Sequence, residues 1–180
     1  YQSASLYKLW TMSVVYSQIS DGKLTEEDVL SEDIARLNTI FKIPEESAEL
    51  QKGTISMPIK KALEQMITIS HNYSALLLTQ KIKASNVSLF LKNNNFNDSK
   101  TGTLAKTSEF DIALFYELLY KGEIVSPEYS QKMIDLLSRQ RLNDRIPKYL
   151  PPGIQIAHKT GELDGVKHDT GIVYTDKGDY

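Results

Sequence analysis

Hydrophobic positions recur at helical spacing in three segments of the first half of the chain. From Ser5 to Ile19 the apolar residues fall on more than one face of a helix, which is typical of a buried central helix, and Gly22 lies where its C-terminal cap would be. Two further helices are predicted at Pro58 to Ser70 and Tyr73 to Ile82, and the polar break Ser70-His71-Asn72 joins them.

Polar residues dominate two long stretches of the chain. Residues 21 to 56 are acid-rich and irregular, which predicts surface turns with short extended or helical pieces. The segment Leu91 to Thr107 is rich in Asn, Asp, Ser, Lys and Gly, which bond their own backbone locally, so a loop is predicted there. Helices are then predicted from Ser108 to Tyr120 and, behind the cap Ser126-Pro127, to about Arg139.

Strand-like alternation begins after Pro151-Pro152-Gly153. Gly153 to His158 alternates apolar and polar residues, and Gly171 to Thr175 is β-branched, so we expect two strands that flank a turn at Glu162 to Val166. The sequence therefore predicts an α+β fold in which a helical body packs on an antiparallel sheet.

The composition is that of one soluble globular domain spanning residues 1–180. The 180 residues are 41% hydrophobic and 24% charged, which is enough for one core without disulfides or metals. A net charge of -2 gives no reason to expect nucleic acid or an anionic membrane surface, and no apolar run approaches the ~18 residues of a membrane span. With Cys 0 there is no thiolate nucleophile, and His71, His158 and His168 lack metal-ligand spacing, so no metal and no cofactor are expected.

Ser5 and Lys8 stand three residues apart at the start of the predicted central helix. Their side chains share one face, so the lysine amine is able to reach the serine hydroxyl, as a base reaches its nucleophile. Unpaired N–H groups at a helix start also favour a developing oxyanion. The structural alternative is a helix cap beside a solvated lysine. The same spacing recurs at Ser20 and Lys23, where Gly22 interrupts the helix end and the geometry is loose.

Lys159-Thr160-Gly161 continues directly from the first predicted strand. It places a cation, a hydroxyl and a backbone without a side chain at an exposed strand edge, where Lys159 and Thr160 can receive the carboxylate of an extended substrate. The alternative is an ordinary edge-strand lysine that discourages aggregation. A second copy, Lys100-Thr101-Gly102, lies in the polar loop and is interpreted as a solvated turn.

Ser70-His71-Asn72 is the third candidate motif, at the junction of two predicted helices. Ser70 could relay a proton to a leaving group, and Asn72 could donate a hydrogen bond to a substrate amide. The alternative is a helix-junction cap, which Ser and Asn often form.

Together and in this order, the three motifs resemble the active-site serine penicillin-recognising superfamily, and most of all its class A β-lactamase group. Other stretches that resemble the family are Met66-Ile67, Arg145-Ile146-Pro147, Leu150-Pro151, Gly165-Val166 and His168-Asp169-Thr170-Gly171-Ile172-Val173. The resemblance runs from about Ser5 to Tyr174 and implies a β-lactamase/transpeptidase-like fold. Since a helix and outer strands precede the nucleophile in that superfamily, and a further strand follows the last one here, it also predicts a single domain shortened at both ends. The start at Tyr1 in place of Met predicts processing or trimming.

The resemblance implies catalytic roles for four residues. Ser5 would be the acylated nucleophile and Lys8 its base or proton relay, while Ser70 and Lys159 would complete the proton and carboxylate network. A positive Lys159 near Lys8 would lower the pKa of Lys8, because like charges disfavour both amines being ionised.

The resemblance also implies a substrate-binding set. Asn72 would hold the substrate amide, and Thr160 and Gly161 would lie beside the substrate. The backbone N–H groups of Ser5 and of Glu162, which follows the Lys-Thr-Gly motif, would form the oxyanion hole.

Two departures from the family pattern bear on activity. His71 replaces the usual Asp of the second motif, at a position that mostly supports local structure. The string Glu-x-x-Leu-Asn, which in class A enzymes carries the glutamate that activates the deacylating water, does not occur between the second and third motifs. The loop there, Phe96 to Thr107, is short, with Asp98 as its only acid, and Glu109 is expected to begin the next helix.

Three functions therefore stay open. The chain would be a β-lactamase-like serine hydrolase linked to antibiotic resistance, a D-alanyl-D-alanine carboxypeptidase or penicillin-binding protein that deacylates slowly, or a catalytically silent relative that binds cell-wall peptide. The resemblance implies a small-molecule β-lactam or a D-Ala-D-Ala peptide as partner, and a periplasmic, secreted or surface-anchored location.

Overall fold

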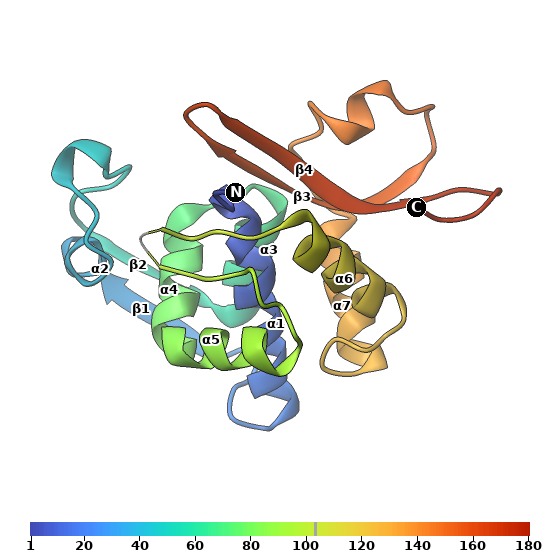
Figure 1. Cartoon of the computed structure of the whole chain (residues 1–180). Coiled ribbons are helices and arrows are strands. Elements are labelled where there is room, and N and C mark those ends of the chain that lie inside the picture. Colours follow the sequence, from blue (N-terminus) through green and yellow to red (C-terminus); the bar gives the residue numbers. More distant parts are fainter. Residues whose placement is uncertain (103) are drawn as a thin grey trace.

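One helix, α1 (Tyr7–Ser20), runs through the middle of the computed structural model, which describes residues 1–102 and 104–180 (Figure 1). A short 3-10 turn, η1 (Ala4–Leu6), leads directly into it. Every side chain from Lys8 to Tyr16 is buried. The helices α3 (Ile59–Thr68), α4 (Asn72–Ile82), α5 (Ala84–Asn93) and α7 (Pro127–Leu137) pack against α1, and α6 (Glu109–Tyr120) reaches it through Phe115. The predicted buried central helix is confirmed.

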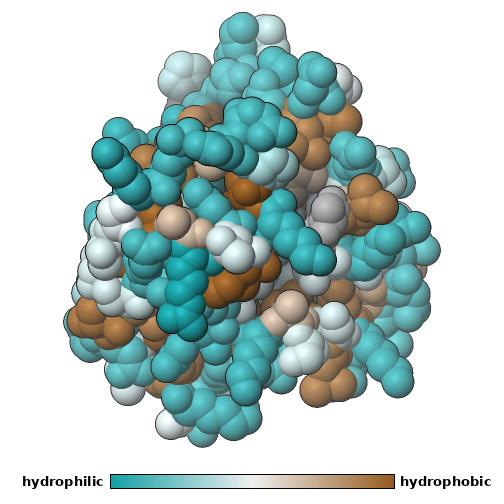
Figure 2. Space-filling model, turned by 90° about the vertical axis from the view of Figure 1, so that its left-hand side faces the viewer, coloured by the Kyte–Doolittle hydropathy of each residue, from teal (hydrophilic) through white to brown (hydrophobic). Residues whose placement is uncertain are grey.

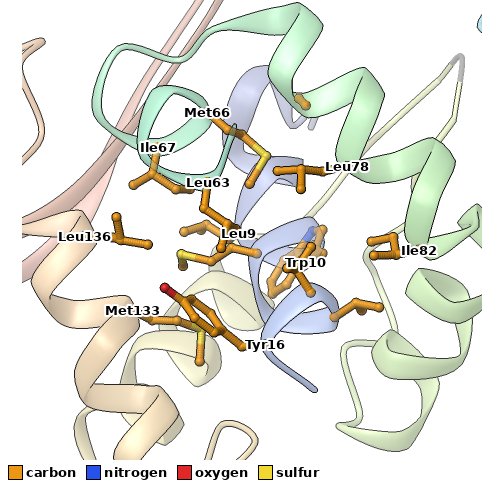
Figure 3. Close-up of a cluster of buried hydrophobic side chains, with 14 of the residues drawn as sticks. Leu9, Trp10, Tyr16, Leu63, Met66, Ile67, Leu78, Ile82, Met133 and Leu136 are labelled. Atoms are coloured by element: carbon orange, nitrogen blue, oxygen red, sulfur yellow. The ribbon is translucent and has the colours of Figure 1, made fainter. Parts of the chain in front are cut away.

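The core around α1 is apolar and aromatic (Figure 3). Trp10 is completely buried, with its ring centroid 4.9 Å from that of Phe96 and 5.2 Å from that of Phe115, which it meets edge-on. Burial of one large apolar side chain of this kind contributes about 1.5–3 kcal/mol relative to leaving it exposed. The turn η1, which carries Ser5, therefore leads into a helix that is anchored in the apolar core.

Two serine caps fix the later helices where the sequence predicts them. Ser108 Oγ accepts a hydrogen bond from Asp111 N (3.1 Å) at the start of α6 (Glu109–Tyr120). Ser126 Oγ accepts one from Tyr129 N (3.3 Å) at the start of α7. Both predicted helices are confirmed, although α7 ends two residues earlier, at Leu137.

The predicted loop from Leu91 to Thr107 begins too early, because Leu91 to Asn93 belong to α5. The Ser and Asn residues of α5 are weak helix formers, but Val87 and Leu91 are buried and packing holds the helix. Beyond it the loop runs beside the N-terminus, where Ser3 N donates to Ala105 O (3.1 Å). Thr103, part of the predicted loop, lies outside the described residues.

Two antiparallel hairpins complete the α+β fold that the sequence predicts. The strands β3 (Gln155–Leu163) and β4 (Val166–Tyr174) pair with Lys159 opposite Thr170, and the hairpin lies across one end of the helical body, against α6 and α7 (Figure 1). The predicted turn at Glu162 to Val166 is too long, since both strands extend into it and leave Asp164 and Gly165 between them.

The second hairpin lies in the region predicted to hold short extended and helical pieces. Its strands are β1 (Val29–Asp33) and β2 (Thr54–Pro58), and between them lie the helix α2 (Ile34–Ile40) and the 3-10 turn η2 (Glu45–Ser47). The face of the molecule on this side is mostly hydrophilic, with hydrophobic residues in separate patches (Figure 2). None of the helices in the described part of the chain has the length and apolar character to cross a lipid bilayer.

Candidate active site

Three segments that are distant in sequence meet at Ser5. The 3-10 turn η1 carries Ser5 and packs against β3, and the α3–α4 junction brings Ser70 to the adjoining α1. Gly161 permits the contact between β3 and the turn, since a Cβ atom at Gly161 would lie 3.2 Å from Ser5 N and 3.3 Å from Ser3 O. The missing side chain of Gly161 thus lets the strand lie directly against the predicted nucleophile.

Two residues of this site have left-handed backbone conformations that side chains disfavour. Ala4, immediately before Ser5, has φ 46°, and Ser70 has φ 57°. For a residue with a side chain this conformation costs roughly 1–2 kcal/mol. Such strain is found often at functional sites, where the surrounding structure holds it in place.

The amine of Lys8 contacts the second motif and not Ser5. Lys8 Nζ lies 2.6 Å from the Ser70 carbonyl oxygen, 2.7 Å from Asn72 Oδ1 and 3.1 Å from Ser70 Oγ. In the part of the chain that the structure describes, no hydrogen bond joins Lys8 Nζ to Ser5 Oγ. The predicted direct pairing of lysine and serine is absent because the amine donates to three oxygens of Ser70 and Asn72 instead.

Ser70 Oγ bridges the two lysines of the site. It lies 3.1 Å from Lys8 Nζ and 3.1 Å from Lys159 Nζ, which also donates to Thr160 O at 2.7 Å. The predicted exposed strand edge is wrong at this point: Lys159 is 0% exposed and Thr160 is 2% exposed. Lys159 is therefore part of the buried network and not a solvated edge lysine.

Burial lowers the pKa of both amines. It lowers the pKa of Lys8 to about 7, although the Glu49 carboxylate acts in the opposite direction. It also lowers the pKa of Lys159 well below its usual value, and the charge of Lys8 lowers it further. The prediction that the Lys8 pKa falls is correct in direction, but burial is its main cause, and the like-charge effect acts on Lys159.

Asn72 is held between Lys8 and an acid that the sequence did not indicate, Glu49. Asn72 Nδ2 donates to Glu49 Oε1 at 2.5 Å, while Asn72 Oδ1 accepts from Lys8. A lysine amine donates and a carboxylate only accepts, so these two partners fix which way the amide faces. Glu49 lies in the loop before β2, far from the three motifs in sequence, and nothing in its neighbouring residues marks it.

The contacts of His71 show how it can replace the usual Asp of the second motif. It is the N-cap of α4, and its Nδ1 accepts a hydrogen bond from Ser74 N at 3.1 Å. Burial lowers the pKa of His71, which favours the neutral ring with a lone pair to accept that bond. The ring nitrogen therefore does what an aspartate oxygen does at an N-cap, and local structure is preserved, as predicted.

The other two histidines have structural partners. His158 Nδ1 lies 2.8 Å from Asp169 Oδ1, and the other oxygen of Asp169 accepts from Ile146 N at 2.9 Å. These bonds tie the segment that carries Arg145 to the β3–β4 hairpin. His168 Nε2 lies 2.8 Å from Gln2 O. Among the described residues, no group of His, Asp or Glu side chains could hold a metal ion.

Ser5 lines two hollows. The first, here called the Arg145 hollow, has a volume of about 510 Å³. It is lined by Ser5, Ser70, Asn72, Arg141, Leu142, Asn143, Asp144, Arg145, Thr160 and Glu162. The second, the Leu104 hollow, has a volume of about 360 Å³. It is lined by Gln2, Ala4, Ser5, Tyr7, Asn72, Gly102, Leu104, Ala105, Glu162 and Leu163.

Arg145 adds a positive charge to the Arg145 hollow, and the sequence analysis gave this residue no role in the site. Its side chain is 15% exposed and forms ion pairs with Glu162 and, at 3.8 Å, with Asp144. Its Nε atom is buried without a hydrogen-bond partner among the described residues. Lys159 is completely buried, so the cations that a ligand in this hollow would meet are Arg141 and Arg145, and Thr160 lines the same space.

Among its described residues, the Leu104 hollow offers little that could activate water. Burial raises the pKa of Tyr7 to about 12, so the phenol stays protonated at neutral pH. Its acidic residue, Glu162, is paired with Arg145 and with Lys167. Neither Asp98 nor Glu109 is among the described residues that line this hollow, and Glu109 begins α6 as predicted.

The second copies of two motifs lie away from Ser5. Ser20 is the exposed last residue of α1, and Lys23 pairs with Asp21 at 2.8 Å. Lys100 forms an isolated bridge with Lys106 in the polar loop. The structure therefore brings together the first Ser-x-x-Lys, the second motif and the last Lys-Thr-Gly, and leaves the duplicates outside.

Comparison with known proteins gives one family. The model of the Beta-lactamase enzyme family matches residues 1–180. A β-lactamase from Sphaerobacter thermophilus is similar in structure, with a TM-score of 0.86 and 25% identity over 99% of this chain and 72% of the other. The predicted β-lactamase/transpeptidase-like fold is thereby confirmed. No curated protein matches the chain.

Two further structures support the same fold at lower identity. A mutant of PBP-A, solved as an acyl-enzyme complex with penicillin-G, has a TM-score of 0.83 and 23% identity over 99% of this chain and 69% of the other. The extended-spectrum β-lactamase TLA-1 has a TM-score of 0.81 and 18% identity over 99% of this chain and 72% of the other.

Proposed function

Since this chain belongs to the β-lactamase enzyme family, we propose that it is a serine acyl-transfer enzyme that β-lactams acylate at Ser5 and that releases the acyl group slowly. Membership places it among β-lactamase-like serine hydrolases. The observation that carries the proposal is the hydroxyl of Ser70, which lies 3.1 Å from two buried amines beside Ser5.

Acylation would use Lys8 as the base. With a pKa of about 7, Lys8 is about half neutral at pH 7 and largely neutral above it, and its lone pair can take the Ser5 proton directly or through Ser70 Oγ. Ser5 Oγ then attacks the lactam carbonyl carbon, and the oxyanion accepts hydrogen bonds from the backbone N–H groups of Ser5 and Glu162. When the C–N bond breaks, the lactam nitrogen takes a proton from the Ser70 hydroxyl, and Lys8 returns the proton to Ser70.

Substrate would be held at two ends. Asn72, exposed at the rim of both hollows, would donate to the carbonyl of the acyl-side amide. Thr160 and Arg145 would receive the carboxylate on the other side, because they line the same hollow as Ser5. Gly161 would let the substrate backbone lie against β3.

Slow release follows from the Leu104 hollow. Deacylation needs a base that takes a proton from a water molecule on the far side of the ester, and the described residues there offer a protonated phenol and a paired glutamate. The acyl-enzyme would therefore accumulate. A D-Ala-D-Ala peptide would acylate Ser5 by the same steps, with D-alanine as the leaving group.

Two other outcomes stay distinct from this proposal. Fast hydrolysis of β-lactams would make the protein a β-lactamase in activity as well as in family. A lack of reaction at Ser5 would make it a silent relative that binds cell-wall peptide. The substrates of the family also lead us to propose a periplasmic, secreted or surface-anchored location.

Labelling of the intact protein tests the proposal. Benzylpenicillin should add one stable acyl group, and peptide mapping should place it on Ser5. The variant Ser5→Ala should not be labelled, whereas Ser20→Ala, the matched change in the second Ser-x-x-Lys, should label like the unmodified protein. Labelling that persists in a folded Ser5→Ala variant would overturn the proposal.

A further inference from the structure

Glu49 faces the amide group that would hold the acyl side of the substrate. Its Oε1 atom accepts from Asn72 Nδ2 at 2.5 Å, on the opposite side of the amide from Lys8. Glu49 is exposed, and it belongs to none of the three motifs. A carboxylate in this position adds a negative charge to the rim of the site, next to the point where the acyl side chain of a donor would emerge.

The position of Glu49 is built into the fold. The next residue, Leu50, is held at its backbone by Tyr73, which directly follows Asn72 and is 1% exposed. Leu50 N donates to Tyr73 Oη (3.1 Å), and the Leu50 carbonyl oxygen accepts from Tyr73 Oη (2.6 Å) and from Asn38 Nδ2 (2.8 Å). Because one helix turn carries both Asn72 and the hydroxyl that fixes Leu50, Glu49 and Asn72 are held opposite each other.

The groups around Glu49 leave its charge available to a ligand. Its neighbours are the amide of Asn72, the neutral phenol of Tyr7, the ring of His71 and the amine of Lys8, whose pKa burial lowers to about 7. Of the two arginines that line the Arg145 hollow, Arg145 is paired with Glu162 and Asp144 instead. A bound acyl group would cover the carboxylate from solvent on one side and strengthen its electrostatic effect.

We infer that Glu49 determines specificity: it selects acyl donors that carry a positively charged amino group next to the acyl-side amide. Such an ammonium would lie beside the carboxylate while the amide carbonyl accepts the second N–H of Asn72. The inference rests on the proposed acylation at Ser5 and adds the class of donor. A neutral donor would gain nothing from Glu49.

Two penicillins that differ by one amino group provide the test. Ampicillin has the structure of benzylpenicillin with an added α-amino group, so the ratio of their acylation rate constants at one pH isolates the effect of the charge. In the unmodified protein this ratio should favour ampicillin, and Glu49→Gln should lower it about fivefold, as expected for a partly exposed ion pair. Glutamine keeps an oxygen for Asn72, so the loop can stay in place without the charge.

Glu46→Gln provides the matched control, because Glu46 is an exposed acid of the same loop, within η2. It should leave the ratio unchanged. Raising the salt concentration should lower the ratio of the unmodified protein towards that of Glu49→Gln, since mobile ions screen exposed charges.

The outcomes separate the two proposals. If both penicillins label Ser5 and the ratio is the same in the unmodified protein and Glu49→Gln, the specificity role is wrong and the acylation stands. A ratio that does not respond to salt would also contradict the role. If neither penicillin labels Ser5, the proposed acylation fails, and with it any selection among acyl donors.

Discussion

The two hollows that Ser5 lines differ in their chemistry. At the Arg145 hollow, a hydroxyl bridges two buried amines, and two arginines and a threonine line the space. On the side of the Leu104 hollow, the wall is the polar loop, with Leu104 69% exposed, and the phenol of Tyr7 is held protonated. The first hollow thus has groups that can carry the proton transfers of acylation, whereas the second has few that can carry those of deacylation. Ser5 can therefore react readily with a donor and yet release the acyl group slowly.

The largest effect is expected from removing the base of the first hollow. Lys8→Ala should slow acylation by β-lactams about a thousandfold, because general-base catalysis of this kind contributes roughly 10²–10⁴-fold. Mass spectrometry of the protein during reaction with benzylpenicillin measures the rate. Lys23→Ala, in the second Ser-x-x-Lys, should react normally, and an equally slow Lys23→Ala would contradict the assignment. Thermal unfolding checks that Lys8→Ala is folded.

A carboxylate placed in the second hollow should reduce the difference between the two sides. Leu104→Glu puts an acid on the loop wall beside Ser5, where it can take a proton from water, so deacylation should accelerate by about a hundredfold. The half-life of the acyl-enzyme after removal of free penicillin measures this. Leu104→Gln is the control of equal size without charge. If Leu104→Glu and Leu104→Gln release the acyl group equally slowly, the lack of a base in the Leu104 hollow is not the cause of slow release.

The pH dependence of acylation should report the buried amine. Because Lys8 acts as a base with a pKa of about 7, the acylation rate should rise about tenfold per pH unit below pH 7 and level off above it. The free energy of unfolding should depend on the same amine. Burial lowers the pKa of Lys8 from 10.5 to about 7, so this amine makes the free energy of unfolding fall as the pH falls across that interval. A rate that rises only near the usual pKa of lysine would contradict the role of Lys8.

The smallest effect is expected at the middle of the second motif. His71→Asp should keep the stability within about 0.5 kcal/mol, because aspartate also caps a helix by accepting from Ser74 N, whereas His71→Ala should lose about 1 kcal/mol. Chemical denaturation measures both. A large loss of acylation in His71→Asp, with stability preserved, would show that the ring acts in the reaction and is more than a cap.

Local signals in the sequence predict the helices and strands well. Ser108, Ser126-Pro127 and the apolar run after Ser5 mark helix starts that the structure confirms, because caps and burial act over a few neighbouring residues. The helix α5 was missed, since its Ser and Asn residues resemble a loop and only its packing against α1 and α4 holds it.

The site could be predicted as a set of residues but not as a geometry. The motifs name Ser5, Lys8, Ser70 and Lys159, and the structure brings these together. Their bonds depend on distant chain segments, so the turn of Lys8 towards Ser70 and the complete burial of Lys159 could not be read from spacing. Glu49 could not be predicted for the same reason, because a loop brings it to the site and no local pattern marks it. Arg145 lies in a stretch that resembles the family, but its place at the site depends on the fold.

The balance between acylation and release is the central claim, and one time course measures it. The protein is allowed to react with an excess of benzylpenicillin, and the penicillin that remains in this reaction mixture is quantified. The free drug is then removed, and the intact mass of the protein is followed over time. The account predicts that one acyl group is added to Ser5 and that the lifetime of this adduct is many times longer than the time needed to form it. It also predicts that little penicillin is consumed beyond one equivalent. Rapid return of the unmodified mass, with many equivalents of penicillin hydrolysed, would contradict it.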